Sequence, residues 1–344
     1  MGDEVIPIKY EFSMVQLSII IPAYNASKTI ERTIASIQQS TLKEIEIWVV
    51  DDGSTDDTLA VVEAFAKGDS RIHVLHQENK GGYMARLCAL RKITAPYFTF
   101  VDADDAVKPE MYECLLKIMK EKNLDIVECD AVGSGKNDGT IGVLEDCASV
   151  YENCIFPRLI QGQGTVFIWD KIYRNKFDFT KFDEVPILMF DDMVFNLQFF
   201  KNCNRFAHVY QDLYYYDVNV GSSVRNYRPK NLYDFVATIN YRRSVAHWFG
   251  LEQGDQVFDL WVVKNCWNLF LTASHAPALS WGIRFANLRE IAKNGEVMAP
   301  FARLKGHYKN YKLQVMKCAI MFPTLFGCLF FVLKRIQRIL RKGR

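Results

Sequence analysis

The stretch YFTFVDADDAVKP, residues 97–109, places three carboxylates within four positions directly after a short apolar run. An apolar run of this length that ends in a turn is typical of a buried strand. Neighbouring anions repel one another and need water or a cation between them. The stretch therefore predicts a strand over Tyr97–Val101 whose end presents its acids to a cation or a charged ligand.

The sequence on both sides of this strand alternates between apolar runs and helical patterns. We expect strands at 17–21, 45–50, 71–76 and 124–128, and helices near 30–37, 59–65, 83–93 and 109–121. This alternation indicates βαβ units and a mostly parallel sheet that is covered on both faces. Ligands bind such sheets outside the carboxyl ends of the strands, where Asp51 and Asp52 also lie.

Composition and charge exclude some classes of partner. The 344 residues are 49% hydrophobic and 24% charged, as in globular proteins. The net charge is +2, but the last eleven residues carry six Lys or Arg and no acid, which leaves the other 333 residues at −4. Nucleic-acid binding needs a basic face, so we expect no nucleic-acid partner.

The cysteines and the first residues predict the compartment. Nine cysteines without a CxxC pair indicate reduced thiols. The stretch MGDEVIPIKYEFSM, residues 1–14, lacks the basic start and apolar run of a signal peptide. We therefore expect a cytoplasmic protein.

Two nucleotide-binding patterns are missing. A dinucleotide fold needs GxGxxG after the first strand, where this chain has PAYNAS (22–27), and a P-loop GxxxxGK[ST] does not occur. Phosphate would then be held in another way. Carboxylates bind Mg²⁺ or Mn²⁺, which in turn bridge to phosphate oxygens, and the acids of residues 102–105 could do this unless they form an ordinary acidic loop.

Four motifs in one order resemble a known family. They are IIIPAYNASKTIERTIASIQQS (19–40), VVDDGSTDDT (49–58), ENKGGYMARLCAL (78–90) and FVDADDAVKPEMY (100–112). Together they resemble the amino-terminal half of a family 2 glycosyltransferase of the bacterial cell-surface polysaccharide type, over 17–125 and more weakly to about 225. The resemblance implies the GT-A fold, a Rossmann-like mixed α/β sheet flanked by helices, with a helical carboxyl-terminal part.

The resemblance also implies contacts to a nucleotide-sugar donor. Pro22, Ala23 and Tyr24 would line the base and ribose, and Asp52 would accept a hydrogen bond from the base. Asp102 and Ala103 would lie near the ribose. Asp104 would ligate a Mg²⁺ or Mn²⁺ ion, with Asp102 beside it and Asp105 assisting. Without the resemblance, Tyr24 would be read as an aromatic that packs on the sheet, and Asp51–Asp52 as a turn before a helix.

The third motif departs from the family pattern NxGxxxARN. Asn79, Gly81, Ala85 and Arg86 match it, but Leu87 stands where relatives often have Asn. The resemblance implies that Arg86 contacts the diphosphate or the sugar. The alternative is an ordinary charge on a helix surface.

FDDMVF, residues 190–195, resembles a later acidic pair of the family. Transfer with inversion needs a carboxylate that takes the proton of the acceptor hydroxyl, and the resemblance gives this role to Asp192, with Asp191 beside it. The alternative is that both acids cap a helix and complement its dipole.

Two weaker matches complete the expected site. Trp169 and Lys171 fit a Trp-x-Lys pattern that implies a place near the acceptor or the diphosphate, with a structural role as the alternative. Ser222, Ser223 and Arg225 fit a Ser-Arg loop that could close over the donor phosphates.

The carboxyl-terminal tail combines an apolar and a basic stretch. CAIMFPTLFGCLFFVL, residues 318–333, is sixteen residues long, short of the roughly 20 that span a bilayer. Apolar residues followed by cations suit an anionic membrane surface. We expect peripheral attachment to the inner face of the cell membrane, and the alternative is a helix that packs on the body or on a dimer partner.

These observations predict an inverting hexosyl- or N-acetylhexosaminyltransferase that moves a sugar from a UDP-sugar to a hydroxyl of a glycan or lipid-linked acceptor. The expected domains are a catalytic domain over 1–225, a helical region over 226–310 and the membrane-associating tail over 311–344. Within the catalytic domain we expect the nucleotide-sugar-binding half at 17–125 and the acceptor half at 126–225. The rivals are a nucleotidyltransferase, which would normally carry a Gly-rich basic loop after strand one, and a catalytically degenerate sugar-nucleotide-binding protein.

Overall fold

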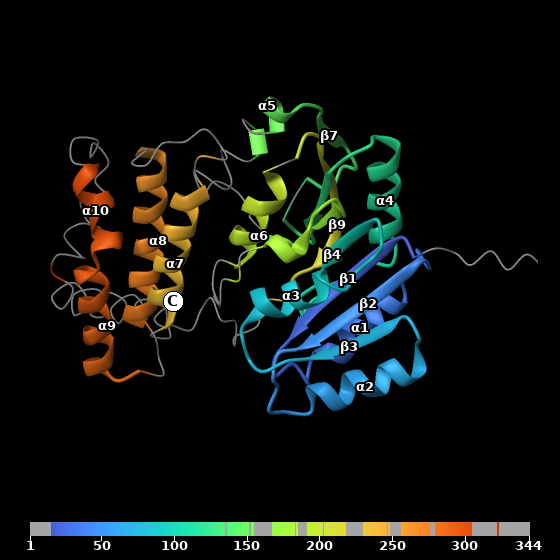
Figure 1. The fold of residues 1–344 in the computed structure, drawn as a ribbon, viewed down its shortest axis with the longest axis horizontal. Coiled ribbons are helices and arrows are strands. Elements are labelled where there is room, and N and C mark those ends of the chain that lie inside the picture. Colours follow the sequence, from blue (N-terminus) through green and yellow to red (C-terminus); the bar gives the residue numbers. More distant parts are fainter. Residues whose placement is uncertain are drawn as a thin grey trace, which may run out of the picture. The chain divides into compact units, whose positions relative to one another are not determined.

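The computed structural model describes two compact units (Figure 1). The described residues are 15–134, 136–150, 153–154, 167–182, 184, 191–201, 203–217, 230–245, 247, 256–275, 279–304 and 322. Unit 1 comprises Met1–Val143, Trp169–Asp183 and Arg205–Asp217, and unit 2 comprises Leu144–Ile168, Glu184–Asn204 and Val218–Arg344. Unit 1 holds almost the whole sheet, whereas the elements described in unit 2 are helices, apart from the last residue of β7.

Four parallel strands form one half of the sheet of unit 1. They are β1 (Leu17–Ala23), β2 (Ile45–Asp51), β3 (Ile72–His76) and β4 (Tyr97–Phe100). β1 pairs with β2 and β4, and β2 pairs with β3. All four strands were predicted, and their carboxyl ends share one edge, where Ala23, Asp51 and His76 stand in register.

The other half of the sheet mixes strand directions. It contains β5 (Ala106–Val107), β6 (Ile126–Ala131), β7 (Ile141–Leu144), β8 (Lys171–Arg174) and β9 (Phe206–Tyr215). β8 runs antiparallel to both β4 and β6, while β9 runs parallel to β6 and antiparallel to β5. The strand order is β3-β2-β1-β4-β8-β6-β9-β5, with β7 paired to β9, so the predicted mixed sheet is confirmed.

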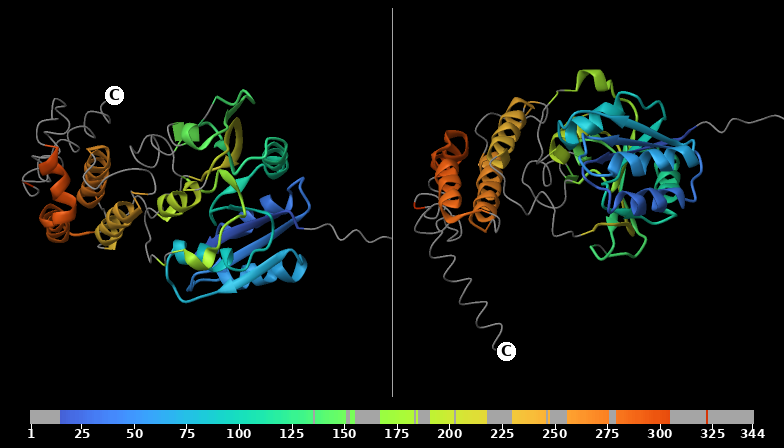
Figure 2. Two further views of the ribbon diagram at one scale, coloured as in Figure 1. Left: turned by 45° about the horizontal axis from the view of Figure 1, so that its top comes forward. Right: turned by 90° about the horizontal axis from the view of Figure 1, so that it is seen from below.

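Amphipathic helices pack on this sheet. They are α1 (Ile30–Gln38), α2 (Thr58–Gly68), α3 (Gly82–Leu90) and α4 (Met111–Glu121). The apolar residues of α1 recur at helical spacing, and Ile30, Ile34 and Ile37 are fully buried. α2 lies along β3, and α3 contacts β1 and β2 (Figures 1 and 2). The start of α1 lies against the turn after β4, which matters for the site.

Unit 2 contains α5 (Cys147–Val150), α6 (Asp191–Phe200), α7 (Lys230–Val245), α8 (Gln256–His275), α9 (Trp281–Lys293) and α10 (Gly295–Arg303). α8 is its centre and contacts α7, α9 and α10. Trp261 of α8 is buried and lies 3.7 Å from the Arg242 guanidinium carbon, measured to the ring centroid. Asp259 accepts two hydrogen bonds of 2.7 Å from Arg303, which ties α10 to α8.

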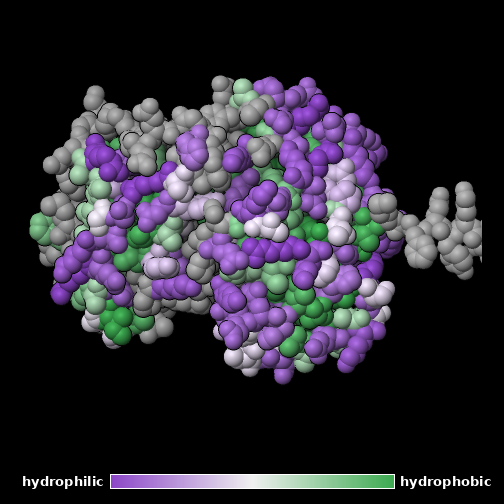
Figure 3. All heavy atoms as spheres, viewed as in Figure 1, coloured by the Kyte–Doolittle hydropathy of each residue, from purple (hydrophilic) through white to green (hydrophobic). Residues whose placement is uncertain are grey.

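The surface in Figure 3 is predominantly hydrophilic over the described residues of unit 1, with smaller hydrophobic patches. No helix within the described part of the chain combines the length and the apolarity that crossing a membrane requires. Apart from residue 322, the predicted tail, 318–333 with the basic residues after it, lies outside the described residues.

Candidate active site

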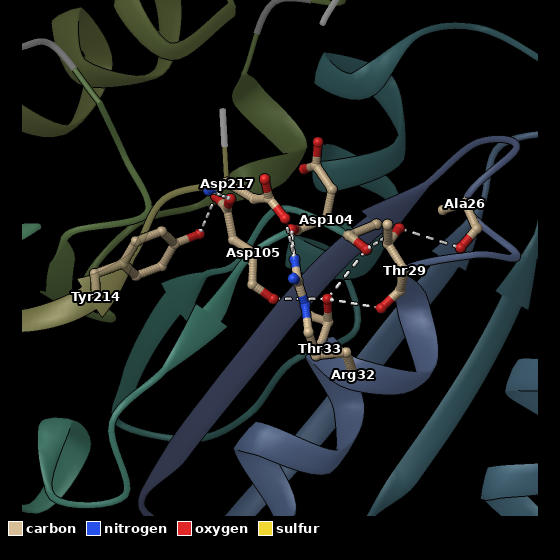
Figure 4. A network of polar contacts seen from close by, with 9 residues as sticks. Ala26, Thr29, Arg32, Thr33, Asp104, Asp105, Tyr214 and Asp217 are labelled. Atoms are coloured by element: carbon tan, nitrogen blue, oxygen red, sulfur yellow. Dashed lines mark hydrogen bonds and ion pairs between the residues drawn. The ribbon is translucent and has the colours of Figure 1, made fainter. Parts of the chain in front are cut away.

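Each of the four backbone carbonyls of the turn after β4, residues 102–105, accepts at least one hydrogen bond within unit 1. Figure 4 shows this turn against Thr29, Arg32 and Thr33. The Asp105 amide donates to the Asp102 carbonyl. The hydroxyls of Thr29 and Thr33 donate to the Ala103 carbonyl, and the Thr33 hydroxyl also donates to the Asp105 carbonyl. The Arg32 guanidinium donates to the Asp104 carbonyl, and all five bonds measure 2.5–3.1 Å. The three side-chain donors come from the start of α1 and the residue before it. These bonds hold the backbone of the turn, and the carboxylates of Asp102 and Asp104 are candidate oxygen ligands for an ion.

The acids of this turn differ in their surroundings. Asp105 is buried, and its two carboxylate oxygens accept from the Tyr214 hydroxyl at 2.7 Å and the Asp217 amide at 2.8 Å. Burial, followed by the charge of Asp102, raises the pKa of Asp105 to about 7. The Asp102 side chain is 30% exposed, and Figure 4 shows the Asp104 carboxylate directed away from Thr33. Asp105, to which the resemblance gives an assisting role, is thus buried and hydrogen-bonded inside unit 1, and it differs in this from the predicted metal ligands Asp102 and Asp104.

Arg86 lies on α3 and is only 6% exposed. Its Nη2 donates to Asp102 Oδ1 at 2.6 Å, and its guanidinium carbon lies 6.0 Å from the centroid of the Phe100 ring. The alternative of an ordinary surface charge is therefore wrong. Leu87, which replaces the family's Asn, is fully buried.

Asp52 organises the chain between β3 and α3. Its carboxylate accepts hydrogen bonds of 2.8 Å from the side chain of Gln77 and from the amides of Lys80 and Gly81. Three bonds leave about one of the four lone-pair sites of a carboxylate for a ligand. Gly53 permits this close approach, since its φ is +72° and an added Cβ would lie 2.8 Å from the Asn79 nitrogen.

The other residues predicted to line the base lie at the end of β1. Pro22 is partly buried, Ala23 is buried, and Tyr24 is 49% exposed. The exposure of Tyr24 leaves much of its side chain open to a ligand. Asp51, beside Asp52, is fully buried, and its Oδ2 lies 2.7 Å from His76 Nδ1.

Trp169 and Lys171 are both buried in unit 1. The Trp169 ring stacks on Tyr214 with 4.2 Å between centroids. The Lys171 ammonium lies 2.6 Å from Asp170 Oδ1 and 3.0 Å from Glu128 Oε2. The structure therefore places Lys171 in a core ion cluster, which agrees with the structural alternative; its place near the acceptor or the diphosphate stays a prediction.

Asp191 and Asp192 are the first two residues of α6 and are partly buried. They belong to unit 2, whereas the 102–105 turn belongs to unit 1. A position at a helix start is also what the capping and dipole alternative requires. Arg225, Ser222 and Ser223 lie outside the described residues.

Comparisons with known proteins agree on one family. Residues 18–202, more than half of the chain, match the family described as "Glycosyl transferase family 2". The chain belongs to glycosyl transferase family 2. This glycosyltransferase is 30% identical over 243 residues to "Uncharacterized glycosyltransferase YibD" of Escherichia coli (strain K12), which covers 66% of this chain and 67% of that protein.

Two further comparisons extend the family assignment. Over 214 residues this glycosyltransferase is 32% identical to "Uncharacterized glycosyltransferase EpsJ" of Bacillus subtilis (strain 168), which covers 60% of this chain and 62% of the relative. The chain therefore spans about two thirds of the length of these relatives. The crystal structure of S. aureus TarS 1-349 in complex with UDP-GlcNAc is similar in fold, with a TM-score of 0.58, 19% identity and coverage of 96% of this chain and 92% of that one. The predicted family and GT-A fold are confirmed.

The buried ion cluster around Glu128 was missed from the sequence of this glycosyltransferase. Glu128 stands opposite Lys171 in the β6–β8 pairing and opposite His208 in the β6–β9 pairing. His208 Nδ1 lies 2.5 Å from Glu128 Oε1, and His208 Nε2 lies 3.2 Å from Asp130 Oδ1. The sequence signal was a set of charged residues inside apolar strands, IVECD (126–130) and KIY (171–173).

Within the described ranges, no three or more His, Cys, Asp and Glu side chains are grouped so that they could hold a metal ion by themselves. The glycosyltransferase offers instead the acidic pair Asp102 and Asp104 on one turn. Two protein carboxylates suit Mg²⁺ or Mn²⁺, because such ions are often bound through one or two carboxylates, with phosphate oxygens and water as the other ligands.

Proposed function

We propose that this protein transfers a sugar from a nucleotide-sugar donor, a UDP-sugar, to a hydroxyl of a glycan or lipid-linked acceptor, with inversion at the anomeric carbon. The sugar would be a hexose or an N-acetylhexosamine. The observation that carries the proposal is the turn 102–105, which has its carbonyls engaged, Asp105 turned inward and Asp102 paired with the buried Arg86. The turn follows the carboxyl end of β4, which lies beside the carboxyl end of β1, where the residues predicted to line the donor are found.

Asp104 and Asp102 would hold a Mg²⁺ or Mn²⁺ ion that neutralises charge on the departing diphosphate. Arg86 would set the orientation of Asp102 through their 2.6 Å ion pair and lower the repulsion between the two acids. Tyr24 and Asp52 would bind the base and exclude water from it. The complex of S. aureus TarS with UDP-GlcNAc supports a UDP-sugar as the donor.

Asp192 would take the proton from the acceptor hydroxyl, on the face of the sugar opposite the leaving nucleotide. Its place in the first turn of α6 supports this role, because the helix amino terminus favours the ionised carboxylate. Asp191 would be the neighbouring alternative. Arg225 would contact the donor phosphates.

The tail would attach the enzyme to the inner face of the cell membrane. Its sixteen apolar residues, 318–333, are followed by Lys334, Arg335, Arg338, Arg341, Lys342 and Arg344. Each cation contributes on the order of 1 kcal/mol near an anionic leaflet. Such attachment would bring the site close to a lipid-linked acceptor.

A screen of nucleotide sugars tests the proposed function. UDP-, GDP- and dTDP-sugars are incubated with the full chain and Mg²⁺, Mn²⁺ or EDTA, and both donor hydrolysis and the shift in Tm are measured. We expect one UDP-sugar to give metal-dependent hydrolysis and stabilisation. Stabilisation without hydrolysis or transfer under any metal would support the degenerate binding protein instead.

A further inference from the structure

The turn 102–105 is held from a second side by the end of β9, far away in the sequence (Figure 4). The Tyr214 hydroxyl donates to Asp105 Oδ2 at 2.7 Å and lies 3.3 Å from the Asp102 amide, which donates to it. The Asp217 amide donates to Asp105 Oδ1 at 2.8 Å. The Asp102 amide and both carboxylate oxygens of Asp105 are thus hydrogen-bonded to Tyr214 and Asp217, which lie more than 100 positions later in the sequence.

Arg32 of α1 contacts both the turn and the segment after β9. Its Nη2 donates to the Asp104 carbonyl at 2.5 Å and to Asp217 Oδ2 at 2.6 Å. One guanidinium nitrogen therefore contacts both Asp104, which is predicted to bind the metal, and Asp217, which lies two residues after β9. The Arg32 side chain is 53% exposed, so we expect its bonds to be weaker than those of the buried Tyr214.

We infer that Tyr214, and to a smaller degree Arg32, are positioning residues that fix the geometry of Asp102 and Asp104 for a metal-bound diphosphate. This inference rests on the proposed function. Tyr214 acts through the backbone of the turn and through Asp105, because its hydroxyl bonds the Asp102 amide and the Asp105 carboxylate. Asp105 transmits the effect, since both of its oxygens are used by β9 and the segment directly after it.

The burial of Asp105 determines how much metal-dependent affinity the loss of the Tyr214 hydroxyl should cost. Asp105 is fully buried, and a buried hydrogen bond that loses one partner leaves the other unsatisfied, which costs more than the loss of an exposed bond. Removing the Tyr214 hydroxyl leaves Asp105 Oδ2 without this donor and frees the Asp102 amide. The turn can then adopt other conformations, so the ion and the diphosphate lose the preorganised pair of carboxylates. We expect about a tenfold loss of metal-dependent affinity, the equivalent of one such bond.

The experiment compares Tyr214→Phe with a matched control. Phenylalanine keeps the ring that stacks on Trp169 at 4.2 Å and removes only the hydroxyl. Tyr112→Phe is the control, because Tyr112 is also fully buried in unit 1 but its hydroxyl has no hydrogen-bond partner among the described residues. Arg32→Met and Arg32→Lys form a second pair at the surface, which does not depend on the folding of a core variant.

Titration calorimetry with UDP, in MnCl₂ and in EDTA, gives the readout. For Tyr214→Phe we expect about a tenfold weaker affinity in MnCl₂ and an unchanged affinity in EDTA. Arg32→Met should lose less, within about fivefold, and Arg32→Lys and Tyr112→Phe should match the wild type. A general packing defect would lower both affinities together and would overturn the positioning role.

The outcome also separates this inference from the proposed function. If the wild type binds UDP more tightly with MnCl₂ and Tyr214→Phe keeps that gain, the positioning role is wrong and the metal site stands. If the wild type shows no metal-dependent gain with UDP, GDP or dTDP, the proposed metal site fails and the inference fails with it.

Discussion

Arg86 and Asp102 form an ion pair of 2.6 Å that joins α3 to the turn after β4. The guanidinium is buried, whereas the carboxylate is partly open to solvent. The two acids predicted to bind the metal therefore differ in what they do for the fold. Asp102 compensates a buried charge, whereas α1 holds the backbone carbonyl of Asp104.

This difference predicts separate effects for two alanine variants. Asp104→Ala should abolish turnover and metal-dependent donor binding with a wild-type Tm, because a carboxylate outside the core contributes little to folding. Asp102→Ala should also abolish turnover, and it should lower the free energy of unfolding by about 1–3 kcal/mol, because it removes a hydrogen-bond partner of a buried guanidinium. Thermal unfolding and donor hydrolysis measure the two effects. Normal hydrolysis by Asp104→Ala would remove that residue from the metal site.

Asp192→Asn tests the proposed base. The amide keeps the shape of the side chain and cannot take a proton, so sugar transfer should fall about 10²–10⁴-fold. Donor affinity, measured by calorimetry with UDP and Mn²⁺, should stay at the wild-type value. If transfer stays within about threefold of wild type, well short of the effect of a general base, Asp192 is not the base. The same measurement on Asp191→Asn then tests its neighbour.

The sequence predicted the local part of this fold and left out the non-local part. β1, β2, β3 and β4 are apolar runs that end in polar turns, and this pattern is local. The insertion of β8 between β4 and β6 depends on pairing across long separations, for which a single sequence carries no signal. The helix patterns of α1 and α4 were equally visible, since their buried residues repeat at helical spacing.

The candidate site also has a part that local sequence patterns predicted and a part that depends on non-local contacts. Asp52, Asp102 and Asp104 follow strand ends and could be found from the four motifs. Tyr214 could not be recognised as a partner of Asp105, because 109 positions separate them and their contact exists only once β9 is in the sheet. The burial of Lys171 was hidden for the same reason, since Glu128 becomes its partner through the β6–β8 register.

Lys171→Met should destabilise the protein without a specific effect on the donor site. The substitution removes the buried ammonium that pairs with Glu128 and Asp170, and the loss of one partner from a buried ion pair costs about 3–5 kcal/mol. Urea unfolding measures the change. Lys181→Met is the control, because the Lys181–Asp178 pair is exposed on both sides and should contribute almost nothing. An unchanged midpoint for Lys171→Met would contradict the core role.

Truncation after Lys317 tests the tail. The full chain should float with liposomes that contain anionic lipid, and the truncated chain should not, because it lacks both the apolar run and the six cations. Hydrolysis of the soluble donor should persist in the truncated protein, while transfer to a lipid-linked acceptor should fall. Equal flotation of the two chains would show that the tail has another role.

His208 should make stability depend on pH. Burial opposes its charged form, but the hydrogen bond and charge of Glu128, together with Asp130, outweigh this and raise the pKa of His208 above its ordinary value. The Lys171 ammonium shares Glu128 with it. A pKa that is higher in the folded state stabilises the fold below the unfolded value of about 6.5, and the contribution is lost as pH rises through the folded pKa.

The free energy of unfolding in urea, measured at pH 6 and pH 9, tests this for the wild type and His208→Gln. We expect the wild type to exceed the variant by more at pH 6 than at pH 9, because only the charged imidazole gains from Glu128 and Asp130. His73→Gln is the control, since that side chain is 41% exposed and lies 3.9 Å from its nearest acid, and its difference from wild type should be nearly the same at both pH values. A gap for His208→Gln that is equal at pH 6 and pH 9 would mean that His208 is held as a neutral packing residue.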